Sequence, residues 1–264
     1  MARGISARKA CRLVGISRSS FAYRGAQDRN AALRDRLHQL AEEHPKMGYR
    51  MAWAHLKDEF SPLNLKRVRR LWNEEGLNLK RKESNRIRVA ARPIESAASP
   101  NEGWSMDFCH DSLASGLKVK CLVIVDEATR ECVALEAHRR IPSSLVVATL
   151  ERAFSERGVP SYIRCDNGPE FRSWSVRLFL KRHGVKLVWI QPGSPWQNGF
   201  AERFIGTLRS ECLSAERLVT LAEAQVHLGA WRRFYNESRP HSSLGYQSPS
   251  SFSLGLSRSV PECA

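Results

Sequence analysis

The stretch that decides the fold is SPWQNGFAERFIGTLRSECL, residues 194–213. It opens as a turn, and its Asn-Gly pair delays the start of the regular helix. From there apolar residues recur at helical spacing and predict one buried stripe, made of Ala201, Phe204, Leu208 and Cys212. Glu202 falls at the margin of that stripe, and Arg209, seven residues later, returns to nearly the same side. A carboxylate and a guanidinium therefore share one edge of a helix that packs on a core.

Two further carboxylates lie in or after strand-like segments upstream. In WSMDFCH, bulky residues alternate with small or polar ones, so a strand would carry Asp107 on the face opposite Trp104 and Met106. Asp166 ends the apolar run YIRC and precedes Asn-Gly-Pro, which predicts a turn. Carboxylates from separate elements can hold Mg²⁺, and two such ions can serve phosphoryl transfer. Since Asp-Asn-Gly is also ordinary turn chemistry, the spacing alone leaves a metal site and plain structural roles both open.

The charge of the chain is unevenly distributed. The 264 residues carry a formal charge of +15, of which +12 belongs to residues 1–100 and +3 to the rest. Such a basic excess suits a polyanion, most simply nucleic acid, and a basic soluble surface or an anionic membrane is the alternative. No apolar run approaches the length of a membrane span. The seven cysteines are scattered and never spaced as CxxC, which argues against a zinc ribbon or a disulfide framework and favours a reducing compartment.

Residues 1–80 predict a helical domain. Two short helices surround Gly15, and three more are expected at about 29–43, 49–60 and 65–75. The last of these has an apolar stripe on one side and basic residues largely on the other. A helix, a short turn and a helix with outward basic residues are typical of a helix-turn-helix that contacts DNA, and a plain hairpin with a charged surface is the alternative. The basic residues are Lys66, Arg67, Arg69 and Arg70.

The remainder divides into a linker, a core and a tail. Residues 81–101 are basic and then rich in Ala, Ser and Pro, which predicts a linker. Residues 102–219 predict three antiparallel strands, then helices alternating with strands, and hence a mixed α/β sheet with helices on its faces. One helix of this region is expected over 171–183. Residues 220–264 predict a final helix and a turn-rich tail.

Several of these segments together resemble a known family. WSMDFCHD, RCDNGPEF, residues 194–213 and WRRFYNESRPHSSLGYQSP are similar to the OrfB-type transposases of bacterial insertion sequences, in the retroviral-integrase-like DDE superfamily. The 35 residues between Asp166 and Glu202 match the separation in such enzymes, and Arg209 fills their basic position. Residues 30–80 also resemble the helix-turn-helix-like segment of the family. The resemblance implies a ribonuclease-H-like fold, with Asp107, Asp166 and Glu202 as a catalytic triad that holds Mg²⁺ or Mn²⁺, two ions per site.

The resemblance also implies an activity and partners. A transposase of this kind cleaves and joins DNA at the terminal inverted repeats of its element, without a covalent protein intermediate. We expect DNA as the partner, a homo-oligomer on DNA, an upstream-frame protein or frameshift fusion, no membrane, and a bacterial cytoplasmic, nucleoid-associated location. Asp111 is expected to follow the first strand and Asp126 to end the second, and both are expected to be structural or to support the triad without belonging to it. The residues expected to contact DNA or to support the site are Gln197, Asn198, Arg209, Arg239 and His241.

Two other functions stay open at this stage. A DNA-binding regulator would use the basic N-terminal part and carry an inactive α/β core. A ribonuclease H-type nuclease would use the same carboxylates on RNA–DNA hybrids. Substitution of the carboxylates distinguishes the first alternative, and hybrid degradation without end joining distinguishes the second.

Overall fold

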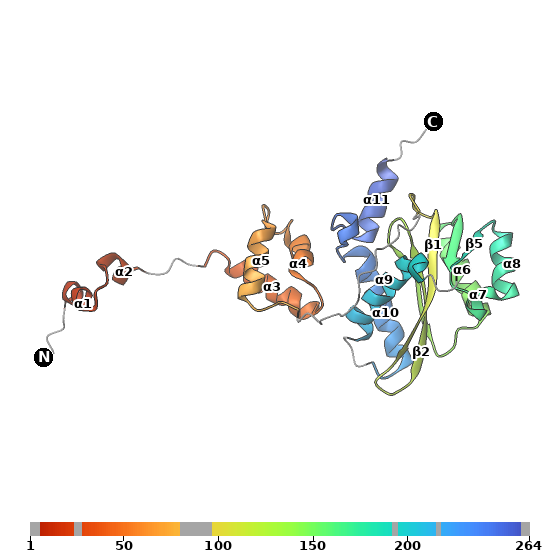
Figure 1. The fold of residues 1–264 in the computed structure, drawn as a ribbon, viewed down its shortest axis with the longest axis horizontal. Helices are drawn as coiled ribbons and strands as arrows, with labels where there is room; N and C mark the ends of the chain where they lie inside the picture. The colour runs from red at the N-terminus through yellow and green to blue at the C-terminus, as the bar shows by residue number, and fades with distance from the viewer. Residues whose placement is uncertain (1–5, 24–27, 80–96, 192–194, 215–217, 260–264) are drawn as a thin grey trace.

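The molecule is built around one five-stranded sheet. The computed structural model describes residues 6–23, 28–79, 97–191, 195–214 and 218–259. The strands are ordered β3-β2-β1-β4-β5, with the first three in sequence antiparallel and the last two parallel to β1 (Figure 1). Their bounds are β1 Gly103–Ser112, β2 Lys118–Asp126, β3 Cys132–His138, β4 Tyr162–Cys165 and β5 Lys186–Trp189. The predicted mixed α/β sheet is confirmed.

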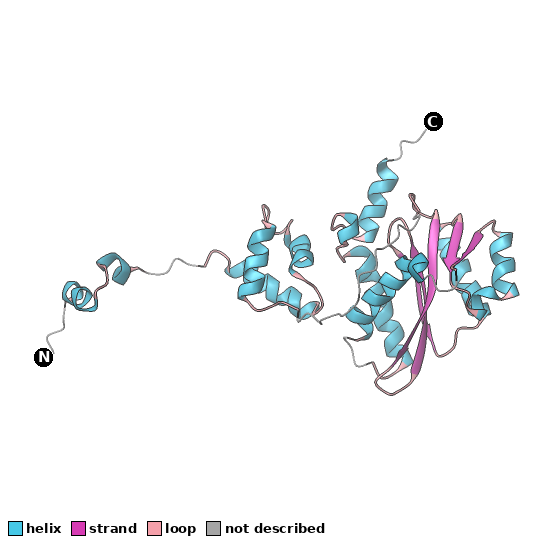
Figure 2. Ribbon diagram, viewed as in Figure 1, coloured by secondary structure: helices cyan, strands magenta, loops and turns pink. Residues whose placement is uncertain are grey.

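Helices cover both faces of this sheet (Figure 2). Because side chains alternate along β1, Trp104 and Met106 enter one hydrophobic cluster and Cys109 enters the other. The first cluster is completed by α6 Ser143–Arg157, α7 Pro169–Arg172 and α8 Trp174–Arg182. The second is completed by α9 Gly199–Leu208 and α10 Leu221–Glu237. Asp107 therefore lies on the face opposite Trp104 and Met106, as the alternation in the sequence predicted, and α9 covers that face.

Two element predictions were wrong. The single helix expected over 171–183 is broken at Ser173, whose backbone is extended and whose hydroxyl accepts a hydrogen bond from Val176 N at 3.4 Å to begin α8. The tail expected to be turns ends instead in a helix, α11 Pro249–Ser259, after a short 3₁₀ turn at Ser242–Leu244. Pro249 suits a first helical position, and Ser248 Oγ accepts from Ser251 N at 3.3 Å.

A separate helical unit precedes the sheet. The helices α3 Ala31–Glu43, α4 Tyr49–Leu56 and α5 Leu65–Glu74 share a hydrophobic cluster of their own. Two shorter helices, α1 Ala7–Val14 and α2 Arg18–Ala22, lie before it on either side of Gly15, which takes a positive φ of 75°. The unit meets the sheet region where the His44 ring stacks on Phe234 of α10 at 4.3 Å. In the part of the chain that is described, no helix is long and apolar enough to cross a membrane.

Candidate active site

Three elements bring the three carboxylates to one end of the sheet. Asp107 lies within β1, and Asp166 directly follows β4, the parallel neighbour of β1. Glu202 lies in the first turn of α9, which packs on β1 and β2. Burial, together with the negative charges of Asp166 and Glu202, raises the pKa of Asp107 to about 6. The carboxylates therefore share one electrostatic environment, although they are far apart in sequence.

The three carboxylates are spread apart in this structure. Asp107 is half-buried, whereas Asp166 and Glu202 are exposed. Among the described residues, no three Asp, Glu, His or Cys side chains converge closely enough to hold one metal ion. Like charges repel one another, so three carboxylates have no reason to converge without a cation. Their oxygen-only donor set nevertheless suits a hard divalent ion such as Mg²⁺.

The Asp-Asn-Gly turn fixes Asp166 at the end of β4. Asp166 Oδ1 accepts a hydrogen bond from Gly168 N at 2.9 Å, and Asn167 Nδ2 donates to Ile190 O at 3.1 Å. A Cβ at position 168 would lie only 3.0 Å from Asp166 Oδ1, which explains the glycine. The turn chemistry and a ligand role are therefore compatible, because the turn holds one carboxylate oxygen in place.

Asn198 connects the start of α9 to Asp107. It ends a 3₁₀ turn, Pro195–Asn198, and is buried. Its Nδ2 donates to Asp107 Oδ2 at 3.2 Å and to Met106 O at 3.4 Å, while Oδ1 is buried without a hydrogen-bond partner among the described residues. The neighbouring Gln197 Oε1 accepts from Gln191 N at 2.8 Å. Both side chains support the site in this structure.

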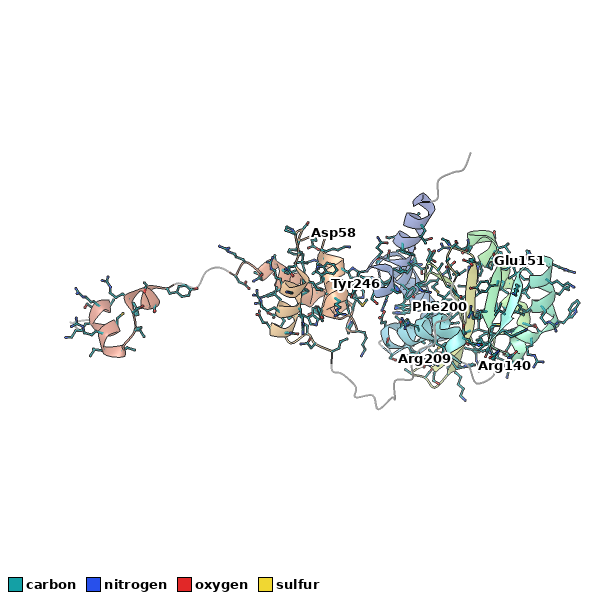
Figure 3. All side chains as sticks on the ribbon, turned by 45° about the horizontal axis from the view of Figure 1, so that its top comes forward. Asp58, Arg140, Glu151, Phe200, Arg209 and Tyr246 are labelled. Atoms are coloured by element: carbon teal, nitrogen blue, oxygen red, sulfur yellow. The ribbon has the colours of Figure 1, made fainter. Side chains whose placement is uncertain are left out.

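Arg209 remains open to solvent near the site. It begins a π-helical turn, Arg209–Leu213, that continues α9. Its Nη2 donates to His110 O at 3.2 Å, and the side chain is exposed (Figure 3). His110 follows Asp107 by three positions on β1. The guanidinium therefore lies against the same strand as Asp107 and is accessible to a phosphate.

A buried ion pair that the sequence analysis missed holds the elements around Asp166. Glu127 is fully buried, and its Oε1 lies 3.0 Å from Nε of Arg164, two residues before Asp166. Glu127 also accepts from Ser105 Oγ at 2.5 Å and from Tyr162 Oη at 2.8 Å. The same arginine donates through Nη1 to Gln197 O at 3.1 Å. A charged residue inside the strand-like run YIRC was the only signal for this network in the sequence.

Two other predicted contact residues lie inside the fold. The Arg239 guanidinium pairs with both carboxylate oxygens of Glu211 at 2.7 Å. His241 is buried, and burial together with the charges of Arg239 and Arg130 lowers its pKa to about 3. These positions favour support of the fold over DNA contact at Arg239 and His241.

The basic residues of α5 differ in accessibility. Lys66, Arg69 and Arg70 are exposed, as an outward-facing set requires. Arg67 is half-buried, and its Nε donates to Asn30 Oδ1 at 2.9 Å, just before α3. The expectation that all four face outward is therefore wrong for Arg67, because it joins α5 to the start of α3.

The two acidic residues set aside from the triad have different surroundings. Asp126 is buried, and its Oδ1 accepts from the backbone N–H groups of Ala128 and Thr129 at 2.9 and 2.8 Å. It therefore shapes the turn between β2 and β3. Asp111, expected to follow the first strand, lies within β1 and accepts from Ser112 N at 2.7 Å.

Three segments of the chain match protein-family models. Residues 97–195 and 183–249 match models described as an integrase core domain, and residues 27–84 match an HTH-like domain. The insertion element IS407 uncharacterized 31.7 kDa protein of Burkholderia multivorans is 42% identical, over 94% of this chain and 90% of its own length. The insertion element IS476 uncharacterized 39.2 kDa protein of Xanthomonas euvesicatoria is 40% identical, over 94% of this chain and 72% of its own.

More distant relatives extend the pattern. Transposase InsD for insertion element IS2 of Escherichia coli is 28% identical, over 81% of this chain and 75% of its own. Among solved structures, a chain of the simian T-cell lymphotropic virus intasome in complex with PP2A regulatory subunit B56 gamma superposes with a TM-score of 0.56. That match has 17% identity and covers 88% of this chain and 76% of the other. It confirms the integrase-like fold that the resemblance implied.

Proposed function

The chain belongs to the insertion-element transposases that carry an integrase core domain, and from that premise we propose that it cleaves and joins DNA at the terminal inverted repeats of its element. As a DNA transposase it is a polynucleotidyl transferase of a metal-dependent family. The observation that carries the proposal is the placement of Asp107 on β1, Asp166 directly after its neighbour β4 and Glu202 on the helix packed against β1, where burial and like charge raise the pKa of Asp107 to about 6.

The three carboxylates are the residues we propose to hold divalent cations, Mg²⁺ or Mn²⁺, with two ions per site. Oxygen donors from a strand, a strand end and a helix would share this task. When bound, the cations would supply charge stabilisation for the attacking and leaving oxygens. The exposed Glu202 has room to approach the other two carboxylates, because no described residue forms a hydrogen bond with its side chain.

The residues around the carboxylates orient them and the DNA. Asn198 holds Asp107 through the 3.2 Å hydrogen bond, and the Gly168 backbone N–H holds Asp166. Arg209 is exposed and would bind a phosphate oxygen beside the scissile bond. In the first step a water oxygen attacks the phosphodiester and frees a 3′-hydroxyl. In the second, that hydroxyl attacks a target phosphodiester, so each P–O bond broken is replaced by one formed.

We further propose a division of labour along the chain. Residues 1–80 bind DNA, 81–101 form a linker, 102–219 perform the chemistry, and 220–264 buttress the core. The linker falls largely outside the described residues. We also propose a homo-oligomer on DNA in the bacterial cytoplasm, with end recognition aided by an upstream-frame protein or a frameshift fusion.

The test is an end-processing assay with an end-labelled duplex of the terminal repeat, its flanking DNA and Mg²⁺. The wild-type chain should nick and join the ends, whereas Asp166→Asn and Glu202→Gln should bind the duplex without reaction. Glu151→Gln, an exposed acid on α6, serves as the matched control and should stay active. Full nicking and joining by the Asp166 and Glu202 variants would contradict the assignment of these carboxylates, whereas DNA binding without any cleavage by the wild-type chain would favour the regulator alternative. No cleavage by the wild-type chain, even when it is fused to the upstream-frame protein, would overturn the proposal.

A further inference from the structure

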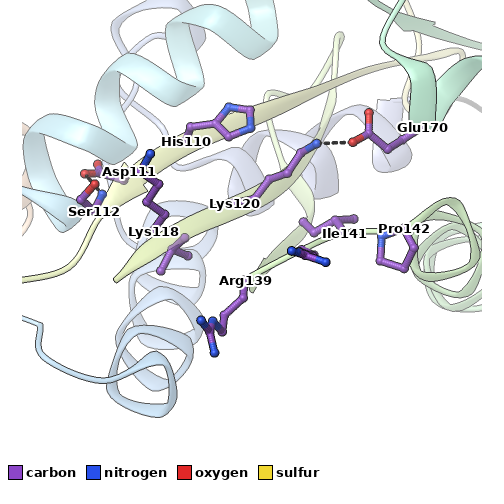
Figure 4. A pocket seen from close by; sticks show the side chains of 11 residues that line it. His110, Asp111, Ser112, Lys118, Lys120, Arg139, Ile141, Pro142 and Glu170 are labelled. Atoms are coloured by element: carbon purple, nitrogen blue, oxygen red, sulfur yellow. Dashed lines mark hydrogen bonds and ion pairs between the residues drawn. The ribbon is translucent and has the colours of Figure 1, made fainter. Parts of the chain in front are cut away.

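A groove of about 710 Å³ opens on the face of the sheet opposite Asp107. It is formed by the ends of β1 and β2, the segment that follows β3, and the start of α7 (Figure 4). His110 in its wall is three residues past Asp107 on β1, and Glu170 is four residues past Asp166. The odd separation along the strand places His110 on the face opposite Asp107, so the groove opens on the α7 side of the sheet, at the ends of β1 and β2.

The lining of the groove is predominantly basic. Lys118, Arg139 and Arg140 line it, are exposed, and form no ion pair with any acid in the described part of the chain. The acids that face them are Asp111 and Glu170. The negative charge of Glu170 is already balanced by Lys120, because Glu170 Oε1 lies 2.5 Å from Lys120 Nζ. Burial opposes this pairing, and the net effect is a lowered pKa of Glu170.

The floor of the groove is fixed by packing. Lys120 Nζ lies 3.8 Å from the centroid of the Phe108 ring, and that ring stacks on Phe171 of α7 at 4.4 Å with an interplanar angle of 2°. These contacts tie the strand that carries Asp107 to the helix that follows Asp166. Three cations without an acidic partner in the described chain thus line a rigid wall, an arrangement suited to the regularly spaced phosphates of a nucleic acid.

We propose that this groove binds the phosphate backbone of DNA that extends from the active site onto the opposite face of the sheet. Lys118, Arg139 and Arg140 contact the phosphates, and the Lys120–Glu170 pair shapes the wall. This inference rests on the proposed function and extends it, because it assigns the path of the strand to residues outside the carboxylate triad. The strand belongs either to the DNA flanking the element end or to the target, since both present the same backbone.

Salt dependence of binding measures these contacts directly. Arg139→Ala/Arg140→Ala is compared with the wild-type chain by fluorescence anisotropy on a terminal-repeat duplex with flanking DNA, without divalent metal. The measured quantity is the slope of log affinity against log salt concentration. Each phosphate contact that is removed should make this slope shallower by about 0.9, so the double variant should lose about 1.8. The matched control Arg182→Ala/Lys186→Ala removes the same charge from α8 and from the start of β5, at the end of β4 opposite Asp166, and should leave the slope unchanged.

Two reaction arms then identify the strand. If the Arg139/Arg140 variant fails to cleave an uncut end, the groove binds the flanking DNA. If the variant cleaves the uncut end but fails to join a precut end to target DNA, the groove binds the target. Thermal melting should be unchanged, because both arginines are exposed. The proposal that the groove binds DNA is overturned if the variant keeps the salt slope of the wild-type chain and the rates of both reactions. Failure of the proposed function is distinguishable, since it abolishes reaction in the wild-type chain while the metal-free slope still reports on the groove.

Discussion

At the scale of single residues, burial decides which basic groups serve the fold and which can meet DNA. His241 and Arg67 occupy basic positions in sequence just as Lys66 does, yet the structure buries the first, half-buries the second and exposes the third. A buried imidazole is held neutral, because its charged form loses hydration without gaining an acidic partner. The consequence is a dependence of stability on pH.

His241 should make the protein less stable in acid. Its folded pKa of about 3 lies below the unfolded value near 6.5, so the unfolded chain takes up the proton first. The free energy of unfolding should therefore fall between about pH 6.5 and 3, by up to about 1.4 kcal/mol per pH unit from this group. Urea unfolding at pH 7, 6 and 5 measures the fall. His241→Asn should show a shallower fall than the wild-type chain, and equal falls in the two proteins would contradict the assignment.

At the scale of elements, the Glu127–Arg164 pair fixes how the strands meet α9. Arg164 lies on β4 and contacts Glu127 after β2 and the backbone of Gln197 before α9. The carboxylate of Glu127 is fully buried, so it depends on these partners for charge compensation. The pair therefore joins elements that carry two of the three proposed ligands.

Arg164→Met should unfold more easily by about 3–5 kcal/mol, because it leaves a buried carboxylate uncompensated. Urea unfolding at pH 7 measures the decrease in stability. Arg152→Met is the matched control, since its pair with Glu136 is largely exposed and should be worth less than about 1 kcal/mol. The double variant Glu127→Gln/Arg164→Met should recover part of the stability. If Arg164→Met and Arg152→Met decreased the free energy of unfolding by the same small amount, the conclusion that Glu127 and Arg164 form a buried, coupled pair would be wrong.

At the scale of the whole molecule, recognition and chemistry are assigned to separate hydrophobic cores. The helical unit of α3–α5 has its own cluster, and the sheet has one cluster on each face. The His44–Phe234 stack is one contact between the helical unit and the sheet region. Substitutions on the outer surface of α5 should therefore alter DNA binding without altering the sheet.

The triple variant Lys66→Ala/Arg69→Ala/Arg70→Ala should bind DNA more weakly and with a shallower salt dependence, reduced by about 0.9 for each phosphate that is no longer neutralised. Its thermal stability should stay close to that of the wild-type chain, because these three side chains are exposed. Anisotropy titrations and thermal melts provide the two measurements. The control is the removal of three exposed cations from α8, at Arg177, Lys181 and Arg182. An equal decrease of affinity in the two triple variants would show that α5 makes only a non-specific contribution.

The local patterns of the sequence predicted much of this molecule. The alternation around Asp107 placed that residue on the face opposite Trp104 and Met106, and the apolar repeat after Gly199 placed the buried stripe of α9. These predictions succeeded because period 2 and period 3.6 are imposed by the backbone itself. The break at Ser173 was missed, because its serine cap competes with an apolar pattern that continues across it.

What the sequence by itself determined is most of the elements, the order of the three carboxylates and the 35 residues between Asp166 and Glu202, because local periodicity and motif order are properties of the chain. Only the tertiary structure decided which charges are buried. It paired Glu127 with Arg164, enclosed His241, and left Arg139 and Arg140 unpaired among the described residues in the groove. Such pairings join residues distant in sequence, and burial depends on every element that packs around a group, so no local pattern encodes them.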